Sequence, residues 1–209
     1  DFTITGVAKG AGMIRPDMAT MLCYVMTDAA VPAEVLREFL VDASDRSFNR
    51  ISIDGDTSTN DTVLVLANGC SGVQIEDPTH RALFQQALID VMRVLAKWLV
   101  KDGEGATKLV DINVKGAASD ADAFRIADAV AHSNLVKTAL FGEDANWGRI
   151  IAAAGRAGVP MEPERVDIYM GKIQMVANGM GCGPDAEMDA TRVLKQDEFA
   201  ITIDLKMGS

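Results

Sequence analysis

The sequence predicts an α+β fold, a layered sandwich of mixed or antiparallel sheet covered by helices. Apolar runs of strand length are mixed with amphipathic helical segments, and residues 166–179 are predicted to form a hairpin of two strands. Strict alternation of strand and helix is absent. The chain has 209 residues, 48% of them hydrophobic, and can therefore bury a sizeable core. One domain is expected because no linker is visible.

The first half of the chain is predicted to hold three strands and two helices. Strands are expected at residues 1–10 and 21–27. Pro32 opens a helical pattern, since proline suits the first turn of a helix. Residues 63–69 are predicted as a strand that ends at Asn-Gly, and residues 78–101 as the longest helix. Apolar residues recur along this helix at helical spacing: Leu83, Ala87, Val91, Val94, Leu95 and Trp98.

The second half continues the mixture of strands and helices. Besides the hairpin, strands are expected at residues 109–117 and 199–207. Helices are expected at residues 120–132, 145–158 and 189–194. The second of these helices is crowded with small residues, which predicts that another element packs closely against it.

The composition argues against several classes of function. The net charge of −10 offers no basic surface for nucleic acid and no polybasic patch for a membrane. No apolar run reaches the roughly 18 residues of a membrane span. Cys23, Cys70 and Cys182 form no CxxC pair, which argues against a zinc ribbon or a redox pair and fits a reducing cytoplasm. No metal site is predicted.

Catalysis through a histidine is also disfavoured. The only two histidines are His80 and His132, and neither lies in an HExxH or CxxCH setting. His80 is predicted in the first turn of a helix and His132 at a helix end. A Ser-His-Asp or Cys-His site is therefore not expected.

Three loops resemble binding-site motifs in part. The segments KGAGMI and GMGCGP fail the GxGxxG pattern at its last position and are predicted as tight turns. The loop from Asp54 to Asp61 has alternating carboxylates, but a calcium loop needs glycine at position six and glutamate at position twelve, where this loop has Thr59 and Val65. It is either a turn stabilised by its polar side chains or an active-site loop.

The segment KGAGMIRPDMATML places Thr20 directly before an apolar strand. A threonine hydroxyl needs a base to act as a nucleophile. If the peptide bond before it is cut, its own α-amine, with a pKa of about 7.7–8, becomes that base. Self-cleavage would need a strained turn upstream, for which Gly10, Gly12 and Pro16 are suitable, and Ala19 is small enough to let the attack geometry form. Thr20 is therefore a candidate nucleophile that needs no histidine.

Four motifs stand in order along the chain: KGAGMIRPDMATML followed by TDA, SIDGDTSTNDT, DGEGATK and FGEDANWGRI. Together they closely resemble the glutamate/ornithine N-acetyltransferase family of arginine biosynthesis. The match spans essentially this whole chain but only about the second half of the family's precursor. The sequence is therefore expected to be part of a longer protein, with an N-terminal-nucleophile-like fold.

The resemblance implies a precursor that cuts itself between Ala19 and Thr20. Residues 1–19 would be the tail of an α chain, residues 20–209 would be most of a β chain, and the assembly would be an α2β2 heterotetramer. The new N-terminal Thr20 would carry the acetyl group from N-acetylornithine to glutamate. No cofactor is implied, although some members of the family accept acetyl-CoA as the acetyl donor.

The resemblance also implies two substrate-binding residues. Lys9 matches a lysine whose ammonium suits a substrate carboxylate, and Glu104 matches a glutamate whose carboxylate suits the ornithine ammonium. The family's oxyanion-hole pair, a threonine and a glycine, lies upstream of Asp1, and a further substrate-binding segment lies beyond Ser209. This chain alone is therefore expected to be inactive. Two alternatives stay open: a self-processing amidase or aminopeptidase with the same nucleophile, and an inactive truncated fragment.

Overall fold

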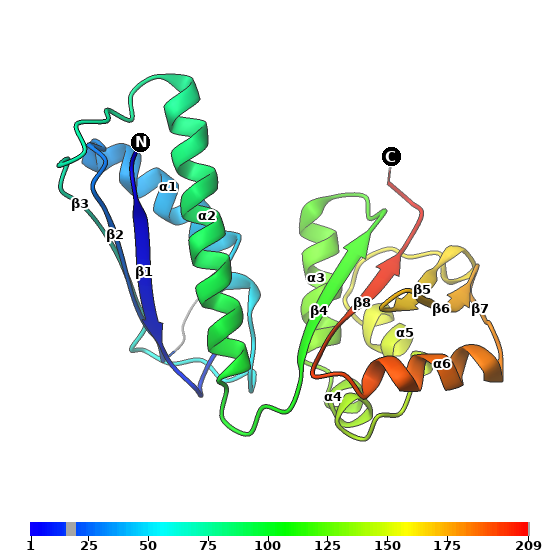
Figure 1. The fold of residues 1–209 in the computed structure, drawn as a ribbon. Coiled ribbons are helices and arrows are strands. Elements are labelled where there is room, and N and C mark those ends of the chain that lie inside the picture. The colour runs from blue at the N-terminus through cyan, green and yellow to red at the C-terminus, as the bar shows by residue number, and fades with distance from the viewer. Residues whose placement is uncertain (16–19, 209) are drawn as a thin grey trace. The chain divides into compact units, whose positions relative to one another are not determined.

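The computed structural model describes residues 1–15 and 20–208. The chain divides into two compact units, Asp1–Ala106 and Thr107–Ser209, each with its own sheet and core (Figure 1). The predicted α+β class, with helices covering mixed sheets, is confirmed. The boundary between these units falls in the short loop DGEGATK, which has none of the length or composition of a linker, and this is why the sequence alone predicts one domain. Within the described residues, no helix is long and apolar enough to cross a membrane.

The sheet of the first unit has three strands in the order β1-β2-β3. They are β1 (Ile4–Lys9), β2 (Leu22–Thr27) and β3 (Thr62–Ala67). β1 is antiparallel to β2, and β2 is parallel to β3. In this register Lys9 faces Leu22, which in turn faces Thr62. The end of β1 therefore lies beside the start of β2, close to Thr20.

Two helices cover one face of this sheet: α1 (Ala33–Asp45) and α2 (Pro78–Lys101), with a short 3₁₀ helix, η1 (Phe48–Arg50), after α1 (Figure 1). Inward-facing residues of β2, such as Cys23 and Val25, are buried against them. Alternate residues of each strand face the helices, as the period of two in a strand requires.

The bounds predicted for α2 are confirmed, because its start carries strong local signals. The Asp77 carboxylate accepts the N–H groups of Thr79 and His80 at 3.0 and 3.1 Å, and Pro78 takes the first helical position. The His80 N–H is the main cause that lowers the pKa of Asp77 below its usual value. The start of this helix is therefore set by four consecutive residues, 77–80.

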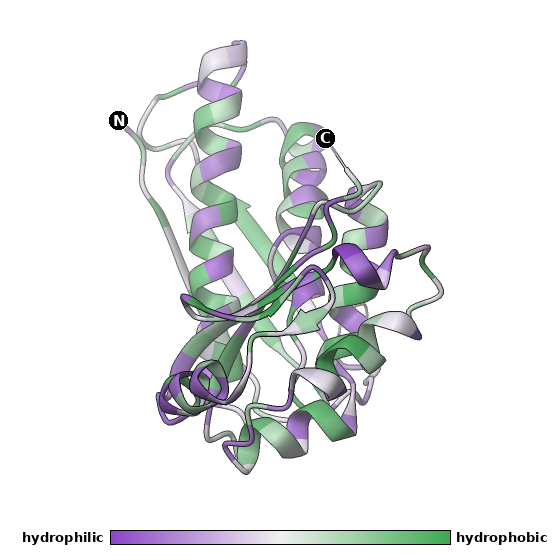
Figure 2. Ribbon diagram, turned by 90° about the vertical axis from the view of Figure 1, so that its right-hand side faces the viewer, coloured by the Kyte–Doolittle hydropathy of each residue, from purple (hydrophilic) through white to green (hydrophobic). Residues whose placement is uncertain are grey.

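The apolar stripe predicted for α2 is buried only in part. Leu83, Val94 and Trp98 are exposed, Trp98 to 64%. The buried residues form another stripe, which shares only Leu95 with the predicted one: Phe84, Leu88, Ile89, Met92, Leu95, Ala96 and Leu99. Hydrophobic and hydrophilic residues alternate along this helix in Figure 2. The helix is apolar on two sides, and periodicity alone could not tell which of them faces the sheet.

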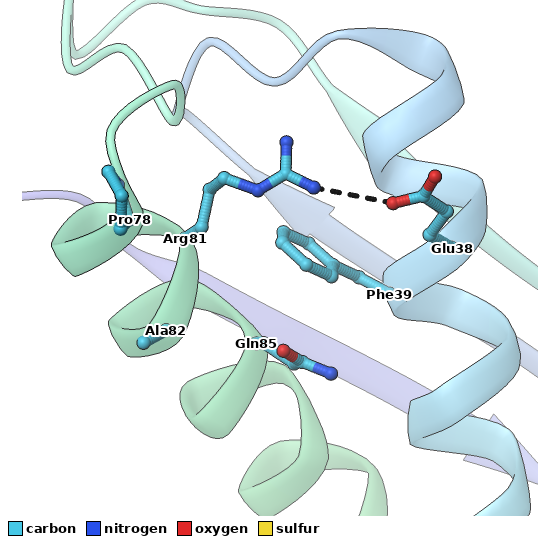
Figure 3. Close-up of a pocket in the computed structure, with 6 residues that line it drawn as sticks. All are labelled: Glu38, Phe39, Pro78, Arg81, Ala82 and Gln85. Carbon is cyan, nitrogen blue, oxygen red and sulfur yellow. Dashed lines mark hydrogen bonds and ion pairs between the residues drawn. The ribbon is translucent and has the colours of Figure 1, made fainter.

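A hollow lies between α1 and α2 near their N-terminal halves (Figure 3). The Arg81 guanidinium lies 5.3 Å from the centre of the Phe39 ring and 3.3 Å from the Glu38 carboxylate. Gln85 donates to Asp42 at 2.6 Å. These contacts tie the two helices together and already occupy the polar groups of the hollow.

The opposite face of the three-stranded sheet is exposed and apolar. Val7, Tyr24 and Leu64 form one row across β1, β2 and β3, and Met26 and Leu66 are adjacent in the next row. Each of these five side chains is between 39% and 57% exposed. A patch of this kind is typical of a surface that another polypeptide covers.

The second unit holds a five-stranded mixed sheet in the order β4-β8-β5-β6-β7. Its strands are β4 (Leu109–Lys115), β5 (Asp167–Met170), β6 (Ile173–Ala177), β7 (Met180–Gly181) and β8 (Glu198–Asp204). Its helices are α3 (Asp120–Ala131), α4 (Asn134–Phe141), α5 (Trp147–Gly155) and α6 (Pro184–Leu194), with η2 (Pro163–Arg165) as a 3₁₀ turn. One hydrophobic cluster joins the helices to the sheet. The predicted hairpin is β5–β6.

Two helices of this unit differ from the prediction. α4 was not predicted, because it has only eight residues and follows closely on α3. α6 begins at Pro184 rather than at Asp189, since Pro184 suits the first position and Asp185 and Glu187 favour a helix N-terminus. Local signals at the N-terminus account for both helices: the Ser133 hydroxyl caps α4, and Pro184 with two acidic residues starts α6.

An ion pair between the buried Asp167 and the partly exposed Lys206 fixes the end of β8 to the β5–β6 hairpin. Lys206 Nζ lies 2.7 Å from the Asp167 carboxylate, which also accepts the Asn178 N–H at 2.8 Å. Burial alone would raise the pKa of Asp167, but these two hydrogen bonds outweigh it and hold that pKa below its usual range. The pair is therefore part of the framework of the second unit.

Candidate active site

The hydroxyl of Thr20 is buried and has no hydrogen-bond partner among the described residues. Leaving a buried hydroxyl unpaired costs about 1–3 kcal/mol, so such groups are rare and often functional. The Thr20 N–H, by contrast, donates to the Met13 carbonyl oxygen at 2.8 Å. Ala19, the other half of the predicted cleavage bond, lies outside the described residues. Thr20 thus presents a free Oγ1 next to an anchored backbone nitrogen.

The turn between β1 and Thr20 depends on glycine at Gly10. Its φ is +156°, and a Cβ there would lie 2.8 Å from the Thr20 carbonyl oxygen. Met13 also has a positive φ, +50°, which is uncommon outside glycine. Gly12 has no positive φ, and Pro16 lies outside the described residues. Of the positions predicted to make this turn special, Gly10 is therefore one that requires glycine. Met13 is a further position of unusual backbone conformation, which sequence reasoning missed.

Glu104 is held against this same turn. It follows α2, and its N–H donates to the Ala11 carbonyl oxygen at 2.7 Å. Its Oε2 would lie 3.1 Å from a Cβ placed on Gly12, so glycine at this position leaves room for the carboxylate. The structure thus brings Glu104 and Thr20 to one turn, although 84 residues of sequence separate them (104 − 20).

Lys9 is the last residue of β1, and its side chain is exposed. Together with Trp98 and Asp102 it lines a hollow of about 470 Å³. Lys9 forms no ion pair with any residue that the structure describes, so its ammonium is available to a carboxylate. A volume of this size falls in the range of about 300–1,000 Å³ usual for small-molecule sites.

Other nucleophiles and bases of the chain are poorly suited to replace Thr20. Burial raises the pKa of the Cys23 thiol to about 11, which keeps it protonated at neutral pH. His80 lies at the start of α2, beside Asp77, while Glu104 follows the end of this helix. The 24 residues of α2 separate its ends by about 36 Å at about 1.5 Å per residue. His132 in the second unit lies 3.0 Å from Asp128.

The polar loop after η1 also contacts the turn, through Asp54. One carboxylate oxygen of Asp54 accepts the Met13 N–H at 2.7 Å, and the other accepts the Ile14 N–H at 3.3 Å. The described residues contain no group of three or more acidic, histidine or cysteine side chains that could hold a metal ion. Of the two interpretations left open for this loop, proximity to Thr20 favours an active-site loop. Sequence reasoning singled out the loop but not the role of Asp54.

The whole chain is similar in sequence to known proteins. The sequence matches the ArgJ family over residues 1–209. The arginine biosynthesis bifunctional protein ArgJ of Geobacter sulfurreducens is 54% identical over 99% of this chain. The glutamate N-acetyltransferase of Methanocaldococcus jannaschii is 49% identical over 98% of it. This chain spans only 53% of the length of each of these relatives.

A solved structure is similar over most of both chains. It is the crystal structure of the arginine biosynthesis bifunctional protein ArgJ of Bacillus halodurans, with a TM-score of 0.84 and 41% sequence identity. The similarity covers 89% of this chain and 88% of that chain. The family that the four sequence motifs resemble is thereby confirmed, and the chain belongs to the ArgJ family.

Proposed function

We propose that the whole protein transfers an acetyl group from N-acetylornithine to glutamate through an acetyl-Thr20 intermediate. The observation that supports this most directly is the buried Oγ1 of Thr20, which has no partner in residues 1–15 and 20–208 and lies next to a backbone nitrogen held by Met13. One of the relatives is named a glutamate N-acetyltransferase, which fits this reaction. Self-cleavage between Ala19 and Thr20 would convert that nitrogen into the amine that serves as the base.

In the proposed reaction, N-acetylornithine binds with its carboxylate at Lys9 and its side-chain ammonium at Glu104. Thr20 Oγ1 attacks the acetyl carbonyl and its proton passes to the Thr20 amine, which then protonates the departing ornithine nitrogen. The acetyl group remains on Oγ1 as an ester. The amine of glutamate attacks this ester, N-acetylglutamate leaves, and the proton returns to Oγ1. Donors for the oxyanion would come from the part of the protein that this chain does not span.

The proposed partner is the α chain of the same precursor. In this proposal residues 1–19 are the tail of the α chain, residues 20–209 belong to the β chain, and two copies of each form an α2β2 heterotetramer. The apolar sheet face at Val7, Tyr24 and Leu64 supports a partner, because exposed apolar side chains adjoin there on three neighbouring strands. The enzyme is proposed to be cytoplasmic, with no nucleic-acid or membrane partner. Acetyl-CoA is proposed only as a possible second acetyl donor, and no other cofactor is invoked.

An acetyl-transfer assay on the full-length protein tests this function. We expect N-acetylglutamate to form from N-acetylornithine and glutamate, with parallel lines in double-reciprocal plots, since an acetyl-enzyme requires ping-pong kinetics. Lines that intersect would show that both substrates bind before either product leaves, which contradicts the intermediate. Release of free acetate without transfer would favour the amidase alternative. Adding acetyl-CoA in place of N-acetylornithine shows whether it is a donor.

Replacing Glu104→Gln should mainly weaken substrate binding. The amide keeps the shape of the side chain but loses the charge that would pair with the ornithine ammonium, so we expect KM for N-acetylornithine to rise about 10-fold or more while kcat changes much less. Steady-state kinetics on the full-length protein measure both constants. Glu76→Gln is a matched control, because Glu76 is an exposed glutamate of the same unit. An unchanged KM in Glu104→Gln would remove Glu104 from the binding site.

A further inference from the structure

We propose that Asp54 is a positioning residue: its carboxylate fixes the Met13 peptide, and through it the nitrogen of Thr20. This inference rests on the proposed function, in which that nitrogen is the base. It gives a role to the polar loop that the proposed reaction leaves unused.

The Asp54 carboxylate accepts hydrogen bonds from two successive peptide groups of the turn. It accepts the N–H groups of Met13 at 2.7 Å and Ile14 at 3.3 Å. Hydrogen bonds to an ionised carboxylate are roughly twice as strong as those between neutral groups. The carboxylate is itself held in place by the Asp56 N–H, at 3.0 Å. A backbone bond from the Ile53 N–H to the Ile14 carbonyl oxygen, at 3.0 Å, joins the same two segments.

These hydrogen bonds are needed because the backbone conformation of Met13 is unfavourable in free energy. Its φ of +50° lies in the left-handed region, which for a residue other than glycine costs roughly 1–2 kcal/mol. Such a conformation persists only where the surroundings enforce it. The Met13 side chain is 49% exposed, so packing of that side chain does little to enforce it. The hydrogen bonds from the Met13 and Ile14 N–H groups to Asp54 therefore provide much of what stabilises this backbone conformation.

The consequence reaches Thr20 through the carbonyl of Met13. That oxygen accepts the Thr20 N–H at 2.8 Å, so the conformation of Met13 sets where the nitrogen lies. Once the bond before Thr20 is cut, a carbonyl that accepts one amine hydrogen leaves the lone pair free to take the proton from Oγ1. A displacement of about 1 Å in such a geometry can lower a rate about 10²-fold.

Asp54 and Glu104 hold different parts of the turn. Glu104 contacts it at Ala11 and Gly12, whereas Asp54 bonds to Met13 and Ile14. Removing the Asp54 carboxylate should therefore reduce kcat, which depends on the base, and leave KM for N-acetylornithine nearly unchanged. Loss of the Glu104 charge should instead raise KM for N-acetylornithine and change kcat much less. This split distinguishes positioning of the base from a general loss of structure.

The test uses the full-length protein with Asp54→Asn, and Asp56→Asn as the matched control. Asp56 is an exposed aspartate of the same loop, and its backbone N–H keeps its bond to Asp54 when the side chain changes. We expect Asp54→Asn to lower kcat about 10²-fold with KM within about threefold, and to slow the formation of a free Thr20 terminus. Asp56→Asn should stay within about twofold of the wild type in all three quantities.

A second change tests the path through Met13. In the Asp54→Asn background, Met13→Gly should restore at least about 10-fold in kcat, since glycine adopts a positive φ without strain. With Asp54 intact, Met13→Ile should reproduce the loss of kcat, because a β-branched residue opposes that conformation. The Met13→Ile arm also decides the proposal if Asp54→Asn fails to fold.

Several outcomes would overturn the inference. A wild-type kcat in Asp54→Asn would contradict it. So would a loss of kcat in Asp54→Asn that Met13→Gly does not reduce, or a wild-type kcat in Met13→Ile with Asp54 intact. A wild-type protein that transfers no acetyl group would instead refute the proposed function. In that case the rate at which the Thr20 terminus forms in Asp54→Asn decides the inference by itself.

Discussion

Thr20→Ala in the full-length protein should abolish both self-cleavage and acetyl transfer. The change removes Oγ1, which in the proposed reaction attacks first the peptide bond before Thr20 and later the acetyl carbonyl. The loss of transfer should be at least about 10³-fold, as is usual when a nucleophile is removed. Mass spectrometry would then find one uncut polypeptide, and the transfer assay no N-acetylglutamate above background.

The same change should leave folding intact or even favour it. The Thr20 hydroxyl is buried without a partner in the described part of the chain, so its removal ends a desolvation cost instead of breaking a bond there. The melting temperature of Thr20→Ala should therefore be equal to or above that of an uncut wild-type precursor. Thr20→Ser is the control, since it keeps a hydroxyl and should retain both reactions at reduced rates. Cleavage or transfer by Thr20→Ala would exclude Thr20 as the nucleophile.

The fold was predictable from sequence where local signals mark an element. α2 is the clearest case, because Asp77 and Pro78 fix its start and Gly103 follows its end. The buried face of the same helix was not predictable from sequence, because apolar residues lie on two sides of it and only the position of the sheet decides which side is buried. The division into two units also left no trace in composition, because residues 102–108 form an ordinary short loop.

Apart from Thr20, which the residues themselves made a candidate nucleophile, the site was predictable only through the resemblance to a family. Periodicity gave no reason to place Glu104 near Thr20, and the structure brings them together through Gly12 and Ala11. The role of Asp54 was not predicted because its hydrogen bonds join residues that are 40 and 41 positions apart in the chain, and no local sequence pattern indicates such contacts. The roles of Thr20, Lys9 and Glu104 stay predictions, whereas the positions of these three residues are features of the fold.

Replacing Gly10→Ala should prevent self-cleavage almost as completely as loss of the nucleophile. A Cβ at Gly10 would lie 2.8 Å from the Thr20 carbonyl oxygen, closer than real contacts allow, and this neighbour is backbone that cannot rotate away. The φ of +156° is also unfavourable for alanine. Either Thr20 or the end of β1 must move, and a shift of about 1 Å should slow cleavage about 10²-fold or more.

A control separates this clash from the general cost of replacing a glycine. Gly72 has a φ of +74° but open space where a Cβ would lie, so Gly72→Ala adds strain without a collision. It should lower stability by about 1–2 kcal/mol and leave cleavage and kcat close to those of the wild type. Gly10→Ala should instead accumulate as an uncut precursor on a denaturing gel. If both variants were cleaved at the wild-type rate, close approach of Gly10 to Thr20 would not be what positions the scissile bond.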